Sequence, residues 1–152
     1  MTQMTEHFSL EELIASDTAV RKGIDNTPTP EVIGHLQVLA ELLEHVRAIL
    51  KHPLHISSGY RSPALNEAVG GVNTAGHLSA HCLGLAADFT CREFGTPLDI
   101  VKVLDSVGLD FDQLIQEGTW VHIATKVSGN RREVLTAHFT NGQKTTYTLG
   151  VV

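Results

Sequence analysis

The apolar positions of the chain follow a helical period most clearly over residues 30–50. Apolar residues recur there at alternating steps of four and three residues: Val32, Leu36, Leu39, Leu43, Val46 and Leu50. This spacing predicts a long amphipathic helix that packs along one face. Thr29 is a favourable N-cap and Pro30 suits the first helical turn, so they mark its start. Pro53 ends it.

Three shorter helices are predicted from their start and stop signals. Residues 9–12 read Ser-Leu-Glu-Glu, which matches a capping box and predicts a helix that begins at Leu10. A Ser-Pro pair opens a helix over residues 62–69, which two glycines stop. A Thr-Pro pair opens another over residues 96–107, which Gly108 closes.

Short apolar and β-branched segments, most of them in the second half of the chain, predict strands. The candidate strands are residues 54–57, 85–90, 111–116, 120–124, 132–140 and 145–149. The Asn141-Gly142 pair predicts a tight hairpin between the last two. Because helices come first and a mostly antiparallel sheet last, the expected fold class is α+β.

Length and charge narrow the possible partners. A chain of 152 residues predicts a single domain over residues 1–152. Seventeen acidic residues against eleven basic ones give a net charge of -6. This balance argues against binding the phosphate backbone of nucleic acid, which needs a basic surface. No apolar run approaches the roughly 20 residues of a membrane span, so membrane insertion is not expected. No feature of the sequence indicates an oligomeric state.

The N-terminal residues do not resemble a secretory signal. The segment MTQMTEHFSLEEL carries acids and a histidine where a signal would show basic residues and then an apolar stretch. We therefore expect the chain to be cytoplasmic as synthesised. If its substrate lies outside the membrane, another system must export it or a phage particle must carry it.

A buried carboxylate gives the first sign of chemistry. Asp88 lies inside the otherwise apolar predicted strand 85–90, and a carboxylate is costly to bury unless it is paired or binds a metal. His81 lies just across the turn at Gly84 and is near enough to share a metal with it. The alternative is that Asp88 caps a loop or pairs with Arg61.

A second histidine extends this candidate site. Strand alternation places Val121 and Ile123 on one face and His122 on the other. Taken alone, His122 could equally be an ordinary core or surface residue. Together with His81 and Asp88 it supplies two imidazoles and one carboxylate, with a fourth position free for water. That is the ligand count of a catalytic zinc site, and this donor set suits zinc over calcium or magnesium.

Two charged residues could complete a hydrolase. Arg61 lies in a loop between a strand and a helix, where its guanidinium can bind a carboxylate or an oxyanion through two hydrogen bonds. Alternatively, it bonds loop carbonyls. Glu117 precedes His122 by five residues and could act as the general base on a zinc-bound water. It could instead be a solvated hairpin residue, because strict alternation places it opposite His122 unless the chain bends at Gly118.

These residues fall within longer stretches that match a known family. The stretches are HFSLEELIASDTAVRKGIDNTP, SGYRSPALNEAVGG, SAHCLGLAADF, FDQLI and WVHI. On them the chain resembles the D-alanyl-D-alanine carboxypeptidase-type zinc peptidases, in particular a small subgroup common in bacteriophages and bacterial genomes. The resemblance covers most of the chain, from His7 to about Leu135. Its pattern S-x-H-x-x-G-x-A-x-D followed by W-x-H is far more specific than any of its parts.

The resemblance implies a fold, an activity and a set of roles. It implies a zinc ion held by His81, Asp88 and His122, with Arg61 on the substrate's carboxylate or scissile carbonyl. Ser79 would help to hold the substrate or the ligand loop. The implied activity is hydrolysis of peptidoglycan stem peptides, either before a terminal D-alanine or between L-alanine and D-glutamate. The implied fold is an α+β domain, similar to the Hedgehog signalling domain, whose antiparallel sheet carries the metal site.

The chain departs from the family at one position. Several members place an acidic general base three residues before the last histidine ligand, where this chain has Thr119. Glu117 is the nearest acid, with Asp112 in reserve, and His77 is an additional imidazole. The departure keeps a second function open: a non-catalytic zinc-containing module that binds cell wall or forms part of a phage, because a fold does not by itself imply catalysis.

Overall fold

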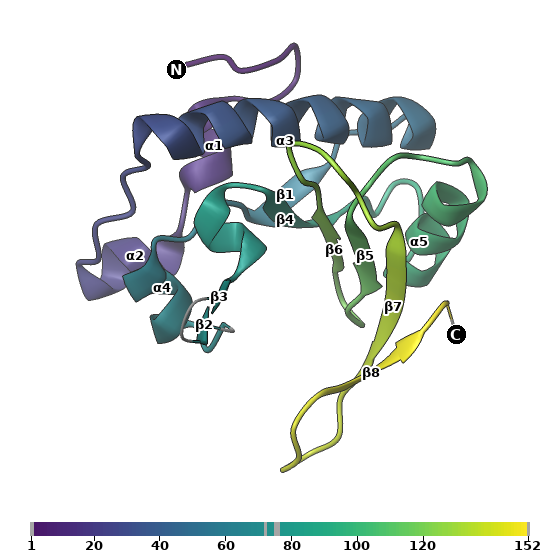
Figure 1. The fold of residues 1–152 in the computed structure, drawn as a ribbon. Helices are drawn as coiled ribbons and strands as arrows, with labels where there is room; N and C mark the ends of the chain where they lie inside the picture. The colour runs from purple at the N-terminus through teal and green to yellow at the C-terminus, as the bar shows by residue number, and fades with distance from the viewer. Residues whose placement is uncertain (1, 72, 75–76, 152) are drawn as a thin grey trace.

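A six-stranded sheet forms the centre of the protein (Figure 1). The computed structural model describes residues 2–71, 73–74 and 77–151. The strands, in their order across the sheet, are β1 (His55–Ser58), β4 (Ala86–Thr90), β6 (Val121–Ala124), β5 (Gln113–Gln116), β7 (Glu133–His138) and β8 (Thr146–Leu149). All neighbouring pairs are antiparallel except β5 and β7, which run parallel. The expected α+β class with a mostly antiparallel sheet is confirmed.

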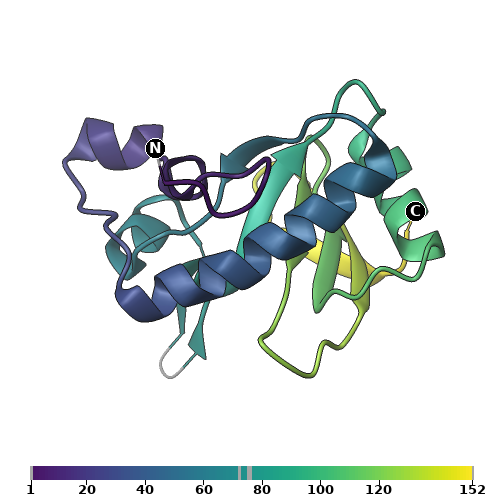
Figure 2. The same ribbon diagram turned by 90° about the horizontal axis from the view of Figure 1, so that it is seen from above.

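The long predicted helix is α3 (Pro30–Leu50), which crosses one face of the sheet (Figure 2). Thr29 caps its start by accepting a hydrogen bond from the Val32 backbone N–H. The helix ends at Lys51, whose left-handed backbone has φ 62°, two residues before the proline expected to stop it. The apolar residues that set the helical period form its buried face: Val32, Leu36, Leu39, Leu43, Val46 and Leu50.

The shorter helices lie where their capping signals predict them. They are α1 (Leu10–Ile14), α4 (Pro63–Ala68) and α5 (Pro97–Ser106). One further helix, α2 (Asp17–Lys22), was not predicted. It has an ordinary cap, because Ser16 accepts a hydrogen bond from the Ala19 backbone N–H. However, Ala19 is its only buried residue, so it shows no apolar period.

Two connections differ from the expectations. The predicted tight hairpin at Asn141-Gly142 is the tip of a longer loop over residues 139–145, closed by a hydrogen bond from the Gln143 N–H to the Thr140 carbonyl oxygen (3.0 Å). Before β4 the chain also forms a small separate pair of strands, β2 (Asn73–Thr74) and β3 (His77–Leu78), and a 3-10 turn, η1 (Ala80–Leu83). In the part of the chain that the structure describes, none of the helices combines the length and apolar character needed to cross a membrane.

The two faces of the sheet have different roles. One face packs against α3 and α5 in the core and carries Ala87, Phe89, Leu114, Val121 and Ile123. The opposite face carries a row of residues that are partners in register across four strands: Asp88, His122, Ile115 and Leu135. The acid and the second histidine of the predicted site therefore lie side by side on the face that α3 leaves uncovered.

Candidate metal centre

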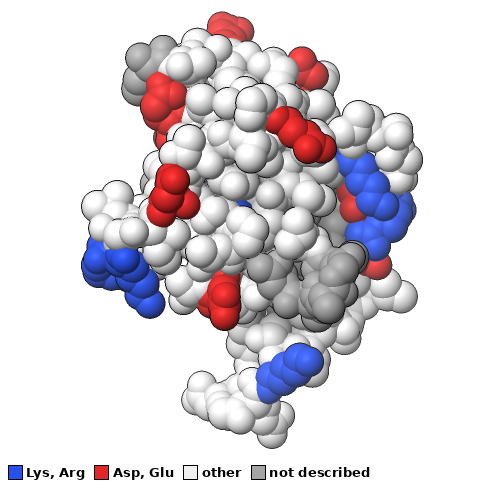
Figure 3. Space-filling model, turned by 60° about the vertical axis from the view of Figure 1, so that its left-hand side comes forward, with Lys and Arg blue, Asp and Glu red and all other residues white. Residues whose placement is uncertain are grey.

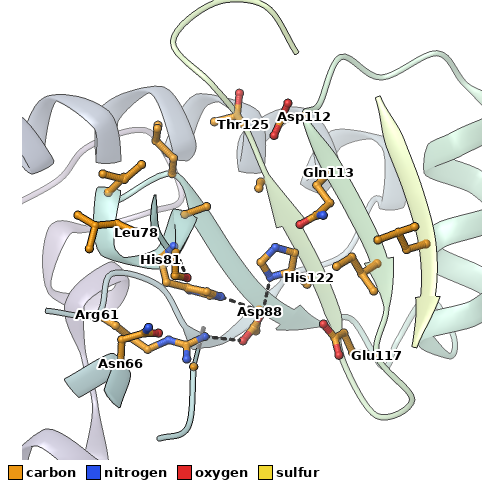
Figure 4. A pocket seen from close by; sticks show the side chains of 18 of the residues that line it. Arg61, Asn66, Leu78, His81, Asp88, Asp112, Gln113, Glu117, His122 and Thr125 are labelled. Carbon is orange, nitrogen blue, oxygen red and sulfur yellow. Dashed lines mark hydrogen bonds and ion pairs between the residues drawn. The ribbon is translucent and has the colours of Figure 1, made fainter. Parts of the chain in front are cut away.

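Three elements bring the predicted metal ligands together. Asp88 on β4 and His122 on β6 are partners in register, so their side chains are neighbours on one face. His81 comes from η1, directly before β4. Figure 4 shows the three side chains pointing toward one another at the floor of a cavity. This convergence is what the sequence predicted, although the residues are separated by up to 41 positions (122 - 81) along the chain.

The distances within the cluster suit a small cation. Asp88 Oδ1 lies 3.0 Å from His122 Nδ1 and 3.3 Å from His81 Nε2. One ligand atom from each of the three residues lies within 4.8 Å of the others. Ligands at about 2.0–2.1 Å from a tetrahedral zinc ion stand roughly 3.3–3.4 Å apart, so the side chains are already near ligating positions.

The hydrogen bonding of His81 leaves a lone pair in need of a cation. Its Nδ1 lies 2.7 Å from the Gly59 carbonyl oxygen, which can only accept, so Nδ1 carries the hydrogen. In a neutral ring Nε2 then presents a lone pair to the Asp88 oxygen, which is also an acceptor. Nε2 is buried and makes no hydrogen bond to any residue that the structure describes. Burial also lowers the pKa of His81, against the opposing effect of Asp88, and so disfavours a second proton. A metal ion bound at Nε2 would resolve this conflict, and a backbone partner on the other ring nitrogen is typical of metal-ligating histidines.

The surroundings of Asp88 favour its ionised form. Burial alone would raise its pKa, but His81 and His122, when protonated, outweigh burial and hold the pKa well below its usual range. Its second oxygen, Oδ2, lies 3.5 Å from Arg61 Nη2. The alternative in which Asp88 pairs with Arg61 therefore also occurs. Asp88 contacts Arg61 through Oδ2 and the two imidazoles through Oδ1, so the two interactions are compatible.

Arg61 brings positive charge to the edge of the cluster. Its backbone N–H donates to the His81 carbonyl oxygen (3.1 Å), which ties its loop to η1. Its side chain is largely buried, and its Nε has no hydrogen-bond partner within the described part of the chain. Burial lowers the pKa of Arg61, but a guanidinium remains charged at neutral pH. The group is therefore a cation in the wall of the cavity, suited to an anionic part of a substrate.

Ser79 acts on the ligand loop. It caps η1, and its Oγ accepts a hydrogen bond from the His81 backbone N–H (3.3 Å). At the other end of η1, Gly84 has φ 75°, and a Cβ there would lie 2.9 Å from Val32 Cγ1 on α3. A side chain is therefore excluded at Gly84 both by its backbone conformation and by the helix against it. These two caps fix the turn that carries His81.

Glu117 lies on the same face of the sheet as the cluster, although counting alternate residues back from His122 along one strand predicts the opposite face. Glu117 directly follows β5 and His122 lies on β6, and in this hairpin Ile115 pairs with His122. Two residues beyond Ile115, Glu117 shares its face and hence that of His122. The bend expected at Gly118 is a full reversal of the chain, with φ 80° at that glycine. Figure 4 shows Glu117 at the end of β5, beside the cluster.

The Glu117 carboxylate is available for chemistry. Burial raises its pKa, partly opposed by His122. No hydrogen bond or ion pair to this carboxylate occurs among the described residues. Asp112 differs, because it accepts hydrogen bonds from Arg131 Nε (3.0 Å) and Nη2 (2.9 Å) and lies at the opposite end of the cavity. Thr119 is exposed, and the side chain of His77 lies outside the described residues.

A cavity of about 630 Å³ contains the whole arrangement. The cluster, Arg61, Ser79 and Glu117 line it, together with Trp120 of the W-x-H pattern and two residues that the sequence does not indicate: Leu135 and Tyr147. Leu135 lies on β7 and Tyr147 on β8. Both reach the site through the pairing of the strands, which the sequence alone does not show. On the surface shown in Figure 3, the basic side chains lie in separate groups with acidic and uncharged residues between them.

A comparison with known families matches the region that carries the site. The family model described as Peptidase M15 matches residues 6–124. This range contains all the candidate residues named from the sequence and ends at the last residue of β6. A comparison with curated proteins finds no match.

Proposed function

This chain belongs to the peptidase M15 family, and we propose that it is a zinc-dependent peptidase that hydrolyses the stem peptides of peptidoglycan. Peptidases of this family are metal-dependent hydrolases. The observation that carries the proposal is the placement of a half-buried carboxylate, Glu117, with no partner among the described residues, in one cavity with a His-Asp-His cluster.

In this proposal His81, Asp88 and His122 hold the zinc ion. Two imidazoles and one carboxylate leave a position open to water, as in catalytic zinc sites. When bound, zinc polarises the scissile carbonyl and lowers the pKa of its water from about 15.7 toward 7. Gly59 and Ser79 contribute by fixing the orientation of His81 through its Nδ1 and its backbone N–H.

Glu117 and Arg61 carry the remaining roles. The Glu117 carboxylate takes a proton from the attacking water and passes it to the leaving amine. Arg61 offers its guanidinium to negative charge on the substrate, either a carboxylate or the oxyanion that develops at the carbonyl. Because Arg61 also contacts Asp88 Oδ2 at 3.5 Å, charge bound at Arg61 is held next to the metal site.

The proposed substrates share a feature that Arg61 can recognise. In both cleavages, before a terminal D-alanine and between L-alanine and D-glutamate, the residue on the amine side of the cut bond carries a free carboxylate. A guanidinium beside the metal site fits either product. The proposal therefore includes both a carboxypeptidase and an endopeptidase type of action, within a Hedgehog-like fold. The chain would reach the wall by export through another system or within a phage particle.

The experiment separates catalysis from mere binding. The zinc-loaded protein is incubated with cell-wall digests, and new amino groups are measured and assigned by mass spectrometry. We expect Glu117→Gln to keep its zinc and lose hydrolysis, because it removes only the proton acceptor. Glu93→Gln is the matched control, since Glu93 is exposed on the loop after β4. Undiminished hydrolysis by Glu117→Gln would contradict the mechanism. A wild-type protein that holds zinc and binds wall fragments without cleaving them would favour the non-catalytic module.

A further inference from the structure

The two C-terminal strands complete the site although they lie outside the range 6–124 matched by the family. β7 pairs in parallel with β5, so its end runs beside the turn over residues 117–120 that follows β5. Leu135 on β7 and Tyr147 on β8 line the same cavity as Glu117. The hairpin of β7 and β8 is therefore a wall of the candidate active site.

Phe139, the residue after β7, packs against the 117–120 turn. A Cβ added at Gly118 would lie 3.3 Å from Phe139 Cε2 and 3.6 Å from Cδ2, so the ring rests on the glycine. The Phe139 and Trp120 rings have centroids 6.4 Å apart and are tilted by 50°, an arrangement that aromatic pairs favour. The Phe139 ring thus packs against Gly118 and Trp120, two residues of the turn.

Hydrogen bonds hold the turn at its base. The Glu117 N–H donates to the Trp120 carbonyl oxygen and the Thr119 N–H to the Glu117 carbonyl oxygen, each at 3.0 Å. The Gly118 N–H also donates to Gln116 Oε1 on β5. These bonds join the turn to the ends of β5 and β6, but none of them comes from a third strand. The Phe139 ring comes from a different strand and supplies such a constraint.

We propose that Phe139 is a positioning residue, whose ring holds the 117–120 turn and so keeps the Glu117 carboxylate directed at the His81–Asp88–His122 cluster. This inference rests on the proposed function, in which Glu117 is the general base. Phe139 itself is 55% exposed and touches no ligand of the cluster among the contacts described above. It acts through Glu117, and its removal leaves the core intact.

The single tryptophan of the chain makes the contact measurable, because Trp120 lies in the turn itself. The variants are Phe139→Ala, Phe139→Leu and, as a matched control, Phe94→Ala, which removes a partly exposed ring outside the cavity. For each, the zinc-loaded protein is assayed for kcat and KM on a stem peptide, for bound zinc, and for acrylamide quenching of Trp120.

We expect Phe139→Ala to lower kcat by about 10- to 100-fold, because a small displacement of a catalytic group has that effect. KM and bound zinc stay at wild-type values, quenching of Trp120 increases, Phe139→Leu restores most of kcat, and Phe94→Ala changes none of these. Wild-type kcat in Phe139→Ala overturns the proposal, as does a loss of kcat that tracks a loss of zinc. If the wild-type protein holds zinc but cleaves nothing, the proposed function fails, and unchanged quenching in Phe139→Ala then overturns the positioning contact separately.

Discussion

Replacing Gly59 by alanine tests how the N-terminal helix supports the metal centre. Gly59 follows β1, and a Cβ there would overlap the Leu13 carbonyl oxygen and lie 3.0 Å from its carbonyl carbon. Both of these atoms belong to backbone, so no rotation of a side chain can relieve the overlap. The same Leu13 oxygen accepts a hydrogen bond from the Tyr60 N–H at 2.8 Å. The substitution therefore separates α1 from β1.

The expected cost follows from these contacts. Overpacking a buried position costs about 1–3 kcal/mol, and losing the Tyr60 hydrogen bond adds about 0.5–1.5 kcal/mol. We expect Gly59→Ala to lower the free energy of unfolding by roughly 2–4 kcal/mol. In a chain of this size that corresponds to a fall in Tm of roughly 5–12 °C.

The same change should weaken metal binding. The Gly59 carbonyl oxygen accepts from His81 Nδ1 at 2.7 Å, and loss of such a partner typically lowers metal affinity about 10- to 100-fold. Urea unfolding of the metal-free protein gives the stability, and zinc titration against a competing chelator gives the affinity.

A matched control should change the free energy of unfolding in the opposite direction. Gly34 lies within α3, is exposed, and has nothing within 4 Å of an added Cβ. Gly34→Ala should raise stability by about 0.5–1 kcal/mol, because alanine loses less backbone freedom in a helix. Equal stability of Gly59→Ala and the wild-type protein would refute the close approach of β1 to α1. Unchanged zinc affinity in a destabilised Gly59→Ala would refute the role of its carbonyl in orienting His81.

Two further predictions concern charged groups. Arg61→Lys should keep zinc but lower kcat/KM by at least about tenfold, because an ammonium cannot form the paired hydrogen bonds of a guanidinium; equal kcat/KM in steady-state assays would exclude paired recognition. Asp112 should stabilise the fold at neutral pH, because Arg131 outweighs burial and lowers its pKa from 3.8. A group with a lowered folded-state pKa loses its contribution as the pH falls through that pKa. The difference in unfolding free energy between the wild-type protein and Asp112→Asn should therefore be about 1–3 kcal/mol at pH 7. This difference should become smaller below pH about 4. A difference that stays constant in urea titrations down to pH 3 would contradict this.

Elements with strong local signals could be predicted from the sequence. The apolar period and the Thr29-Pro30 start located α3 almost to the residue. The six-residue α2 lacks such a period because it buries only Ala19, and its Ser16 cap alone was not sufficient to predict it. The parallel pairing of β5 with β7 has no local signal either, since alternation describes a strand and not its partner.

The candidate site likewise contains some residues that the sequence predicts and others that it does not. A lone carboxylate in an apolar strand pointed to Asp88, and the structure places His81 and His122 beside it. The face of Glu117 was not predictable by counting back from His122, because the count crosses a chain reversal at Gly118. Residues that reach the cavity through strand pairing, such as Tyr147, carry no mark in the sequence itself.

Zinc binding by single-residue variants tests the central claim most directly. Each chain should bind one zinc ion, and X-ray absorption should show only nitrogen and oxygen ligands at about 2.0–2.1 Å. His81→Ala, Asp88→Ala and His122→Ala should each lose the ion, while His52→Ala, which removes a histidine paired with Glu93 away from the cavity, should keep it. Wild-type zinc affinity in any of the three cluster variants, or no zinc in the folded wild-type protein, would contradict a metal centre built on these residues.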